Sequence, residues 1–270
     1  MKKVSILILI AAVSVCMYSC KGKNAKQADQ TKTETKSFQE SQEEQYILVQ
    51  LDSISQIMSR LKPFEFISST EGGKVVLTAR EKQVKPNYLM KADVINDLQT
   101  LSQKYRAAAV LYIDKKIASL YDMPTNDYDA SLRKLVADIN DPSLRKVFGD
   151  EGDMAESLKA FYESSKSNNR LSFFWDVCSS ALVEQVFIAS QNADKFLSSF
   201  SDEDASQLSY EIALLTIAVN DLARINSDYS ELNKAIEPLG ALNAINLQQF
   251  KDQLAEVKAE VSASRQSLLK

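Results

Sequence analysis

The sequence predicts an all-α fold, a single bundle of about seven or eight helices around one buried central helix at about residues 171–200. Glycine and proline are scarce, with six and five among 270 residues. Long segments whose apolar residues recur at spacings of three and four lie between these breakers, as is typical of helices. The stretch 171–200 contains neither breaker and is apolar on nearly every side, which indicates a helix buried within a core.

Apolar side chains form more than one stripe along the predicted central helix. The first stripe consists of Cys178, Leu182, Val186, Ala189, Ala193, Phe196 and Phe200. A second set lies on another side and consists of Phe173, Val177, Ala181 and Ile188. Because the two sets leave little polar surface, we expect the other helices to pack around this one.

The segments before the central helix are divided by prolines. A stripe from Ile47 to Leu61 predicts a helix that Pro63 ends. The region 63–86, which contains the pair Gly72-Gly73, fits either a small hairpin or an extended loop. Residues 86–124 contain no breaker and fit either one long helix or two stacked helices.

Capping signals mark the boundaries of the remaining helices. A short helix is expected at 128–139, followed by one that Asp141 caps and Gly149 ends, with Pro142 at its first position. Another helix runs from about 154 to 168. The boundaries after the central helix are the capping box at Ser201–Asp204, the turn at Pro238–Gly240, and Asn246 as the cap of a last helix that continues to Leu268.

The first nineteen residues have the pattern of a secretory signal. Lys2 and Lys3 precede an apolar core, and the segment closes on Ser19-Cys20. This ending resembles the lipobox of bacterial lipoproteins, in which the cysteine is lipidated and becomes the first residue. The resemblance implies lipidation of Cys20 and attachment to a membrane through that lipid; the alternative is an ordinary secretory signal.

The resemblance to lipoproteins divides the chain into a signal peptide (1–19), a disordered tether that begins at the lipidated cysteine (20–45), and an all-α domain (46–270). The tether is polar and is too poor in apolar residues to order itself. Removal of Cys16 and lipidation of Cys20 would leave Cys178 with no partner for a disulfide within the chain.

Two segments carry a resemblance to a wider family. Residues 106–121, and residues 175–189 with the string from Val183 to Ala189, resemble helices of uncharacterised Bacteroidota-type envelope lipoproteins. The resemblance covers about residue 46 to the C-terminus and implies a helical lipidated body with no reaction assigned. Lys21-Gly22-Lys23 lacks the acidic residues that direct such lipoproteins to the cell surface, which implies the periplasmic side of the outer membrane.

The composition argues against several kinds of chemistry. The chain has no histidine, so Ser-His and Cys-His nucleophile pairs and histidine metal sites are absent. Ser131–Lys134 and Ser143–Lys146 match the Ser-x-x-Lys string of penicillin-binding enzymes, but the companion strings are missing. The formal charge of −4 gives no support for nucleic-acid binding. We therefore expect no cofactor, no metal and no nucleic-acid partner.

Glu184 is the most informative polar residue, because it lies between Val183 and Val186 in the most apolar segment. Burial of a carboxylate is costly unless it is paired or protonated. Glu184 could hydrogen-bond to another helix, bind a ligand or face solvent. We expect it to be buried and held by a partner from residues 86–124; the candidates for this buried polar or ligand site are Tyr112, Lys115 and Arg106.

These observations predict a membrane-anchored, non-catalytic envelope lipoprotein that acts as an interaction or structural module, with another envelope protein as a candidate partner. The alternative is a binder of a small apolar or amphipathic ligand in a pocket between helices. A pocket of several hundred Å³ beside Glu184 would favour the binder, whereas a large exposed apolar patch without a pocket would favour the module.

Overall fold

The computed structural model describes residues 41–42, 45–49, 75–149 and 153–270, without the side chain of Ile225. All of them belong to one unit, Ser37–Lys270. Within these residues every regular element is a helix and none is a strand, which confirms the all-α class. The predicted signal peptide, Cys20, Gly72-Gly73 and most of the helix predicted at 47–61 lie outside the described residues.

Described helical residues lie on both sides of the boundary that the sequence predicts for the domain. Residues 41–42 and 45–49 are helical, whereas the disordered tether was expected to extend to residue 45. Ile47 and Leu48 pack against the buried core. Burial of these two apolar side chains offsets part of the cost of ordering the backbone that carries them.

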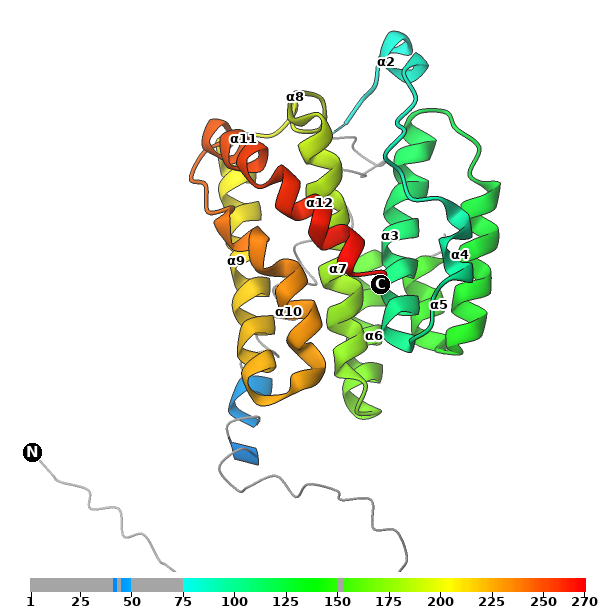
Figure 1. Cartoon of the computed structure of the whole chain (residues 1–270), viewed down its shortest axis with the longest axis vertical. Coiled ribbons are helices and arrows are strands. Elements are labelled where there is room, and N and C mark those ends of the chain that lie inside the picture. Colours follow the sequence, from blue (N-terminus) through cyan, green and yellow to red (C-terminus); the bar gives the residue numbers. More distant parts are fainter. Residues whose placement is uncertain (1–40, 43–44, 50–74, 150–152) are drawn as a thin grey trace, which may run out of the picture. The chain divides into compact units, whose positions relative to one another are not determined.

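Helix α7 (Leu171–Gln191) lies at the centre of the domain (Figure 1). Its side chains are buried without interruption from Phe174 to Ser190. It packs most extensively on α3 (Leu101–Leu120) and α12 (Lys258–Ser267), and also contacts α6 (Met154–Ser167). The prediction of a buried central helix is therefore confirmed.

Within the described residues, α7 alone is long and apolar enough to cross a membrane by length and composition. Yet 89% of its most apolar window is buried inside the fold. The same apolar pattern is found in membrane-spanning helices and in the core helices of globular domains. The burial of α7 inside the fold matches a core helix.

The central helix ends at Gln191, so the predicted range 171–200 is too long. Asn192 has φ −157 and leaves the helical region, and its side chain accepts a hydrogen bond from the N–H of Lys195 to start α8 (Ala193–Phe196). Phe196 and Phe200 remain buried beyond the break. The apolar stripe thus continues across a change of direction, and periodicity alone does not reveal the break.

Helices α3 and α7, which contact each other, both contain runs of small side chains. Ala107, Ala108 and Ala109 on α3, and Ser179, Ser180 and Ala181 on α7, are fully buried. Small residues on both helices let their backbones approach closely. Helix α3 begins at a capping box formed by Thr100 and Gln103 and follows the short 3₁₀ helix η1 (Ala92–Asn96). Residues 86–124 thus contain one long α-helix, α3, and the 3₁₀ helix η1 that precedes and contacts it.

One flank of α7 is formed by α3 with α4 (Asn126–Ile139) and α5 (Pro142–Phe148) (Figure 1). Asn140 has φ 54, a left-handed conformation that asparagine tolerates, and it turns the chain between α4 and α5. Asp141 then accepts the N–H of Ser143, with Pro142 in the first turn, as the sequence predicts. Before η1, the chain forms the short helix α2 (Ala79–Gln83).

The other flank contains α9 (Asp202–Ile225), α10 (Ser230–Ile236) and α11 (Leu247–Glu256), with the 3₁₀ turns η2 (Ser227–Tyr229) and η3 (Glu237–Ala241) between them. The predicted caps at Ser201 and Asn246 are confirmed. A break at Val257 separates α11 from α12, whereas one helix was expected. Because of the breaks at Val257 and Asn192, the described residues form more helices than the expected seven or eight, and several of these helices are shorter than predicted.

Candidate functional site

Glu184 is held at the centre of the fold by an arginine from the last helix. Its side chain is 0% exposed. Arg265 of α12 donates from Nε to Oε2 over 2.6 Å and from Nη2 to Oε1 over 2.8 Å. This bidentate geometry is the strongest form of charge-assisted hydrogen bonding between side chains, and it joins α12 to α7.

A second buried carboxylate, Asp114 of α3, shares the same arginine. Arg265 donates from Nη2 to Asp114 Oδ2 over 3.3 Å, and the backbone N–H of Met90 donates to the same oxygen over 2.6 Å. Asp114 is also 0% exposed. The three side chains form what we call the central network, Asp114, Glu184 and Arg265, which ties α3, α7, α12 and the chain before η1 together.

One guanidinium faces two carboxyl groups in the central network, and burial favours the neutral form of Asp114. Burial raises the pKa of Asp114 well above its ordinary value of 3.8, and the charge of Glu184 raises it further, while Arg265 acts in the opposite direction. Asp114 Oδ1 has no hydrogen-bond partner as an acceptor. A protonated Asp114 can donate a hydrogen bond to Glu184.

Aromatic rings cover the central network. The guanidinium carbon of Arg265 lies 4.2 Å from the centroid of the Phe187 ring. Tyr88 meets Phe187 edge-on, with centroids 6.0 Å apart. Tyr128 donates its hydroxyl proton to the carbonyl of Met90 over 2.8 Å. The network is therefore enclosed by packed side chains, and its role is to hold segments together.

The predicted partners of Glu184 are wrong, although its burial is as predicted. Lys115 Nζ pairs with Asp129 at 2.7 Å, and Arg106 Nε pairs with Asp176 at 2.6 Å.

The ring of Tyr112 lies 5.4 Å from that of Phe148, between centroids. The structure thus does not bring Glu184, Tyr112, Lys115 and Arg106 into one site. The predicted segment 86–124 does supply a neighbour of Glu184, but it is Asp114.

Asp114 and Arg265 were missed although the sequence contains a signal for each. Asp114 directly follows the apolar run from Ala107 to Ile113, the same anomaly that singles out Glu184. Arg265 lies four residues after Val261 and three before Leu268, so it falls on the apolar stripe of its helix. Two buried acids require a cation nearby, and charge balance would have directed attention to this arginine.

Further polar links join α3 to its neighbours. The Arg106–Asp176 pair is buried on both sides, and burial raises the pKa of Asp176 while the charge of Arg106 opposes this shift. Tyr105 donates to Asp141 Oδ2 over 2.8 Å and accepts from Arg170 over 2.8 Å. These contacts hold the Tyr105 hydroxyl between two partners inside the protein.

The serines of the two Ser-x-x-Lys strings and Cys178 are either hydrogen-bonded within the fold or buried. Ser131 donates to the carbonyl of Ala92 over 2.8 Å, and Ser143 donates to Asp141 over 2.6 Å. Cys178 is buried, and burial raises the pKa of its thiol, which disfavours the reactive thiolate. Across residues 75–149 and 153–270 there is no group of three histidine, cysteine or acidic side chains that could hold a metal.

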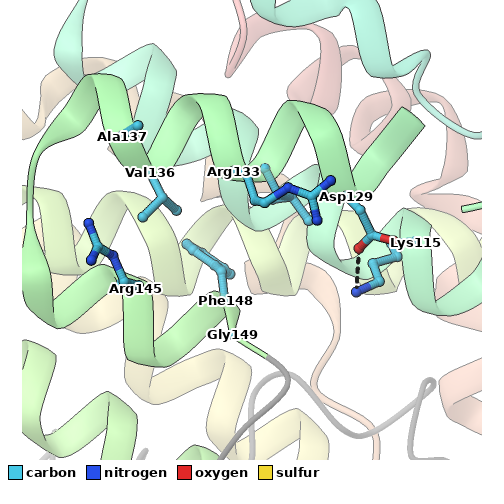
Figure 2. A pocket seen from close by; sticks show the side chains of 9 residues that line it. Lys115, Asp129, Arg133, Val136, Ala137, Arg145, Phe148 and Gly149 are labelled. Atoms are coloured by element: carbon cyan, nitrogen blue, oxygen red, sulfur yellow. Dashed lines mark ion pairs between the residues drawn. The ribbon is translucent and has the colours of Figure 1, made fainter. Parts of the chain in front are cut away.

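A cleft of about 410 Å³ opens at the surface between α4 and α5, near Lys115 of α3. Figure 2 shows Val136 and Phe148 between Arg145 on one side and Arg133 on the other. Leu132, Ala137 and Gly149 also line the cleft, as does the Lys115–Asp129 pair. Cationic side chains beside apolar ones suit a ligand that carries a negative charge and an apolar part.

Comparisons of the chain with protein-family models, with curated proteins and with solved structures find no match. Two features of the described residues bear on function: the central network, which is enclosed, and the α4–α5 cleft, which is open to solvent. The first can hold helices together, and the second can receive a molecule from outside.

Proposed function

We propose that the protein is a membrane-anchored, non-catalytic envelope lipoprotein whose helical domain acts as an interaction module. The main observation that supports this proposal is that the charged groups of the central network are enclosed. Asp114 and Glu184 are 0% exposed and bonded to Arg265, so the strongest acid–base groups of the core face one another and not a substrate. The signal that closes on Ser19-Cys20 supports the anchor.

The surface of α9 offers a place for a partner. Tyr210 and Ile217 are 53% and 56% exposed. They lie seven residues apart and thus on the same face of the helix. Two exposed apolar side chains on one face of the helix offer a partner protein apolar contacts. By the family resemblance, this partner is an envelope protein on the periplasmic side of the outer membrane.

Detergent phase partitioning tests the anchor. We expect the wild-type protein to enter the detergent phase and the Cys20→Ala variant to remain in the aqueous phase, because the lipid supplies the membrane affinity. Cys16→Ala is the matched control and is expected to partition like the wild type. Equal partitioning of Cys20→Ala and wild type would contradict lipidation at Cys20.

Site-specific photo-crosslinking in cells tests the interaction surface. A photoreactive residue at position 210 or 217 is expected to give a discrete adduct with one envelope protein. The control places it at Lys159, which is exposed on α6, and is expected to give no such adduct. The same adduct pattern from all three positions, or none from 210 and 217, would contradict a partner on α9.

The α4–α5 cleft favours a second function, the binding of a small amphipathic ligand between helices. Its volume of about 410 Å³ falls within the range of about 300–1,000 Å³ that is common for ligand sites. The sequence predicts such a pocket beside Glu184, whereas the cleft lies beside Lys115. Binding at this surface is compatible with an enclosed central network.

A further inference from the structure

We propose that the α4–α5 cleft binds an amphipathic carboxylate, an aliphatic chain with one carboxylate head, through Arg133 and Arg145. This inference rests on the second of the two functions above, because it names the site and ligand class for that function. Three observations support it: the positive charge of the cleft, the apolar side chains at its floor, and the absence of protein partners for the two guanidinium groups within the described residues.

The charge of the cleft comes from Arg133 of α4 and Arg145 of α5. Both side chains are exposed, and neither forms a hydrogen bond or an ion pair with the part of the chain that the structure describes. The third cation, Lys115, is paired with Asp129 at 2.7 Å. The charges of that pair cancel, so the cleft presents the positive charge of its two arginines.

The apolar floor is built from side chains that also belong to the core. Leu132, Val136 and Phe148 are 4%, 9% and 7% exposed. Each therefore shows a small edge to the cleft while the rest of the side chain is packed. A floor held in this way is preformed, so a bound chain need not order it, which lowers the cost of binding.

The position of the two arginines around this floor favours a ligand that has both a carboxylate head and an apolar body. Arg145 and Arg133 lie on either side of Val136 and Phe148 (Figure 2). A guanidinium donates several N–H bonds in a planar fork that matches a carboxylate. A ligand with its head on one arginine must lay its body across Val136 and Phe148, which favours an aliphatic chain over a small hydrophilic anion.

A second cleft, of about 490 Å³ beside α2, contains lysines but is a weaker candidate. Lys82 Nζ pairs with Asp122 at 2.9 Å, and Lys85 donates to the carbonyl of Tyr121. Its cations thus have partners within the protein. The arginines of the α4–α5 cleft have none among the described residues, so an added anion there replaces only water.

Equilibrium dialysis with radiolabelled octanoate tests the proposal on the full-length lipidated protein, held in lipid discs of zwitterionic phosphatidylcholine. Counts bound to empty discs are subtracted. We expect the double variant Arg133→Gln, Arg145→Gln to weaken octanoate binding about tenfold or more, because the carboxylate head then has no guanidinium group to bind. Arg80→Gln is the matched control: Arg80 is exposed on α2 outside the cleft, and its replacement is expected to leave binding unchanged.

Two further measurements separate the head and the tail of the ligand. Unlabelled octanoate is expected to compete, whereas acetate and octanol, which each keep one half of the molecule, are expected not to compete at the same concentration. Ala137→Trp introduces a bulky side chain at an exposed position on the cleft wall and is expected to block binding.

No saturable binding of octanoate, equal losses in Arg80→Gln and the cleft variants, or competition by acetate as strong as by octanoate would each overturn the proposal. Circular dichroism on every variant confirms that the helices remain folded. The detergent-partitioning and crosslinking experiments do not involve the cleft, so failure here leaves the interaction module standing, and failure there leaves the cleft standing.

Discussion

Arg265 is the residue on which the central network depends. It supplies the only positive charge that contacts Asp114 and Glu184 among the described residues, and both carboxyl groups are fully buried. Burial of charges in this way does not by itself stabilise a fold, because the loss of hydration offsets the attraction. Removal of one partner is a different matter, since the remaining charges stay buried without compensation.

We expect Arg265→Ala to lower the free energy of unfolding by about 3–5 kcal/mol, as is typical when one partner of a buried pair is removed. Arg265→Lys should also destabilise, because an ammonium group cannot reproduce the bidentate contact with Glu184. Chemical denaturation followed by circular dichroism measures both changes.

Arg224→Ala is the control for the Arg265 variants. The Arg224 side chain is 72% exposed and pairs with Asp221 on the helix surface, so we expect a change within about 0.5 kcal/mol. If Arg265→Ala were as mild as this control, the central network would not hold the helices together.

The raised pKa of Asp114 predicts a pH dependence of stability. In the unfolded chain this carboxyl loses its proton near its ordinary pKa of 3.8, while the folded state retains the proton to higher pH. The stabilisation from Asp114 is thus fully present below pH 3.8 and is lost as pH rises toward the folded-state pKa. Asp114→Asn keeps the shape of the side chain, and its amide group does not ionise.

We therefore expect Asp114→Asn to gain stability relative to the wild type as pH rises above about 4, by up to about 1.4 kcal/mol per pH unit. Denaturation at a series of pH values gives the difference between the two proteins. Asp138→Asn, at an exposed position on α4, is the control and should follow the wild type. A constant difference between Asp114→Asn and wild type at all pH values would show that Asp114 titrates normally.

The sequence predicts individual buried residues better than their partners. The burial of Glu184 and Cys178 follows from the apolar residues around them, which are their near neighbours on the same helix. The partner of Glu184 is 81 residues away. Its choice depends on how α12 crosses α7, and helical periodicity contains no information about this crossing.

At the scale of elements, the sequence predicts where helices start more reliably than where they break. The caps at Asp141, Ser201 and Asn246 are local, because side chain and backbone partners lie two or three residues apart. The breaks at Asn192 and Val257 interrupt apolar stripes that continue on the other side. At both breaks the packing of the flanking segments determines where the helix bends. The spacing of apolar residues continues unchanged across the bend and therefore does not reveal it.

The capping box of α9 should contribute measurably to stability. The Ser201 hydroxyl accepts the N–H of Asp204, and the Asp204 carboxylate accepts the N–H of Ser201. We expect Ser201→Ala to lower the free energy of unfolding by about 1 kcal/mol.

Thr125→Ala provides the control for the cap, because Thr125 precedes α4 without a side-chain capping bond. It should change stability by a few tenths of a kcal/mol, as changes away from such features do. Thermal denaturation of the two variants in parallel gives the comparison. Equal effects would mean that the capping bond of Ser201 contributes nothing beyond the loss of a hydroxyl.

For the molecule as a whole, the sequence predicts the architecture but not the candidate site. An apolar segment with no breaker is sufficient to predict that α7 is central, and the structure confirms it. The cleft combines Lys115 of α3 with residues of α4 and α5. Its shape depends on the angle between short helices, which is a tertiary property.

The central claim is that α7 is the buried core around which the domain folds, so that its side chains meet solvent only when the domain opens. Cys178 reports on this claim directly, because it is 1% exposed and has no disulfide partner among the described residues. Thiol labelling of the native protein, read at the Cys178 peptide by mass spectrometry with and without denaturant, measures its protection. We expect slow labelling in buffer and a rise that follows global unfolding as denaturant increases. Rapid labelling without denaturant would contradict the claim.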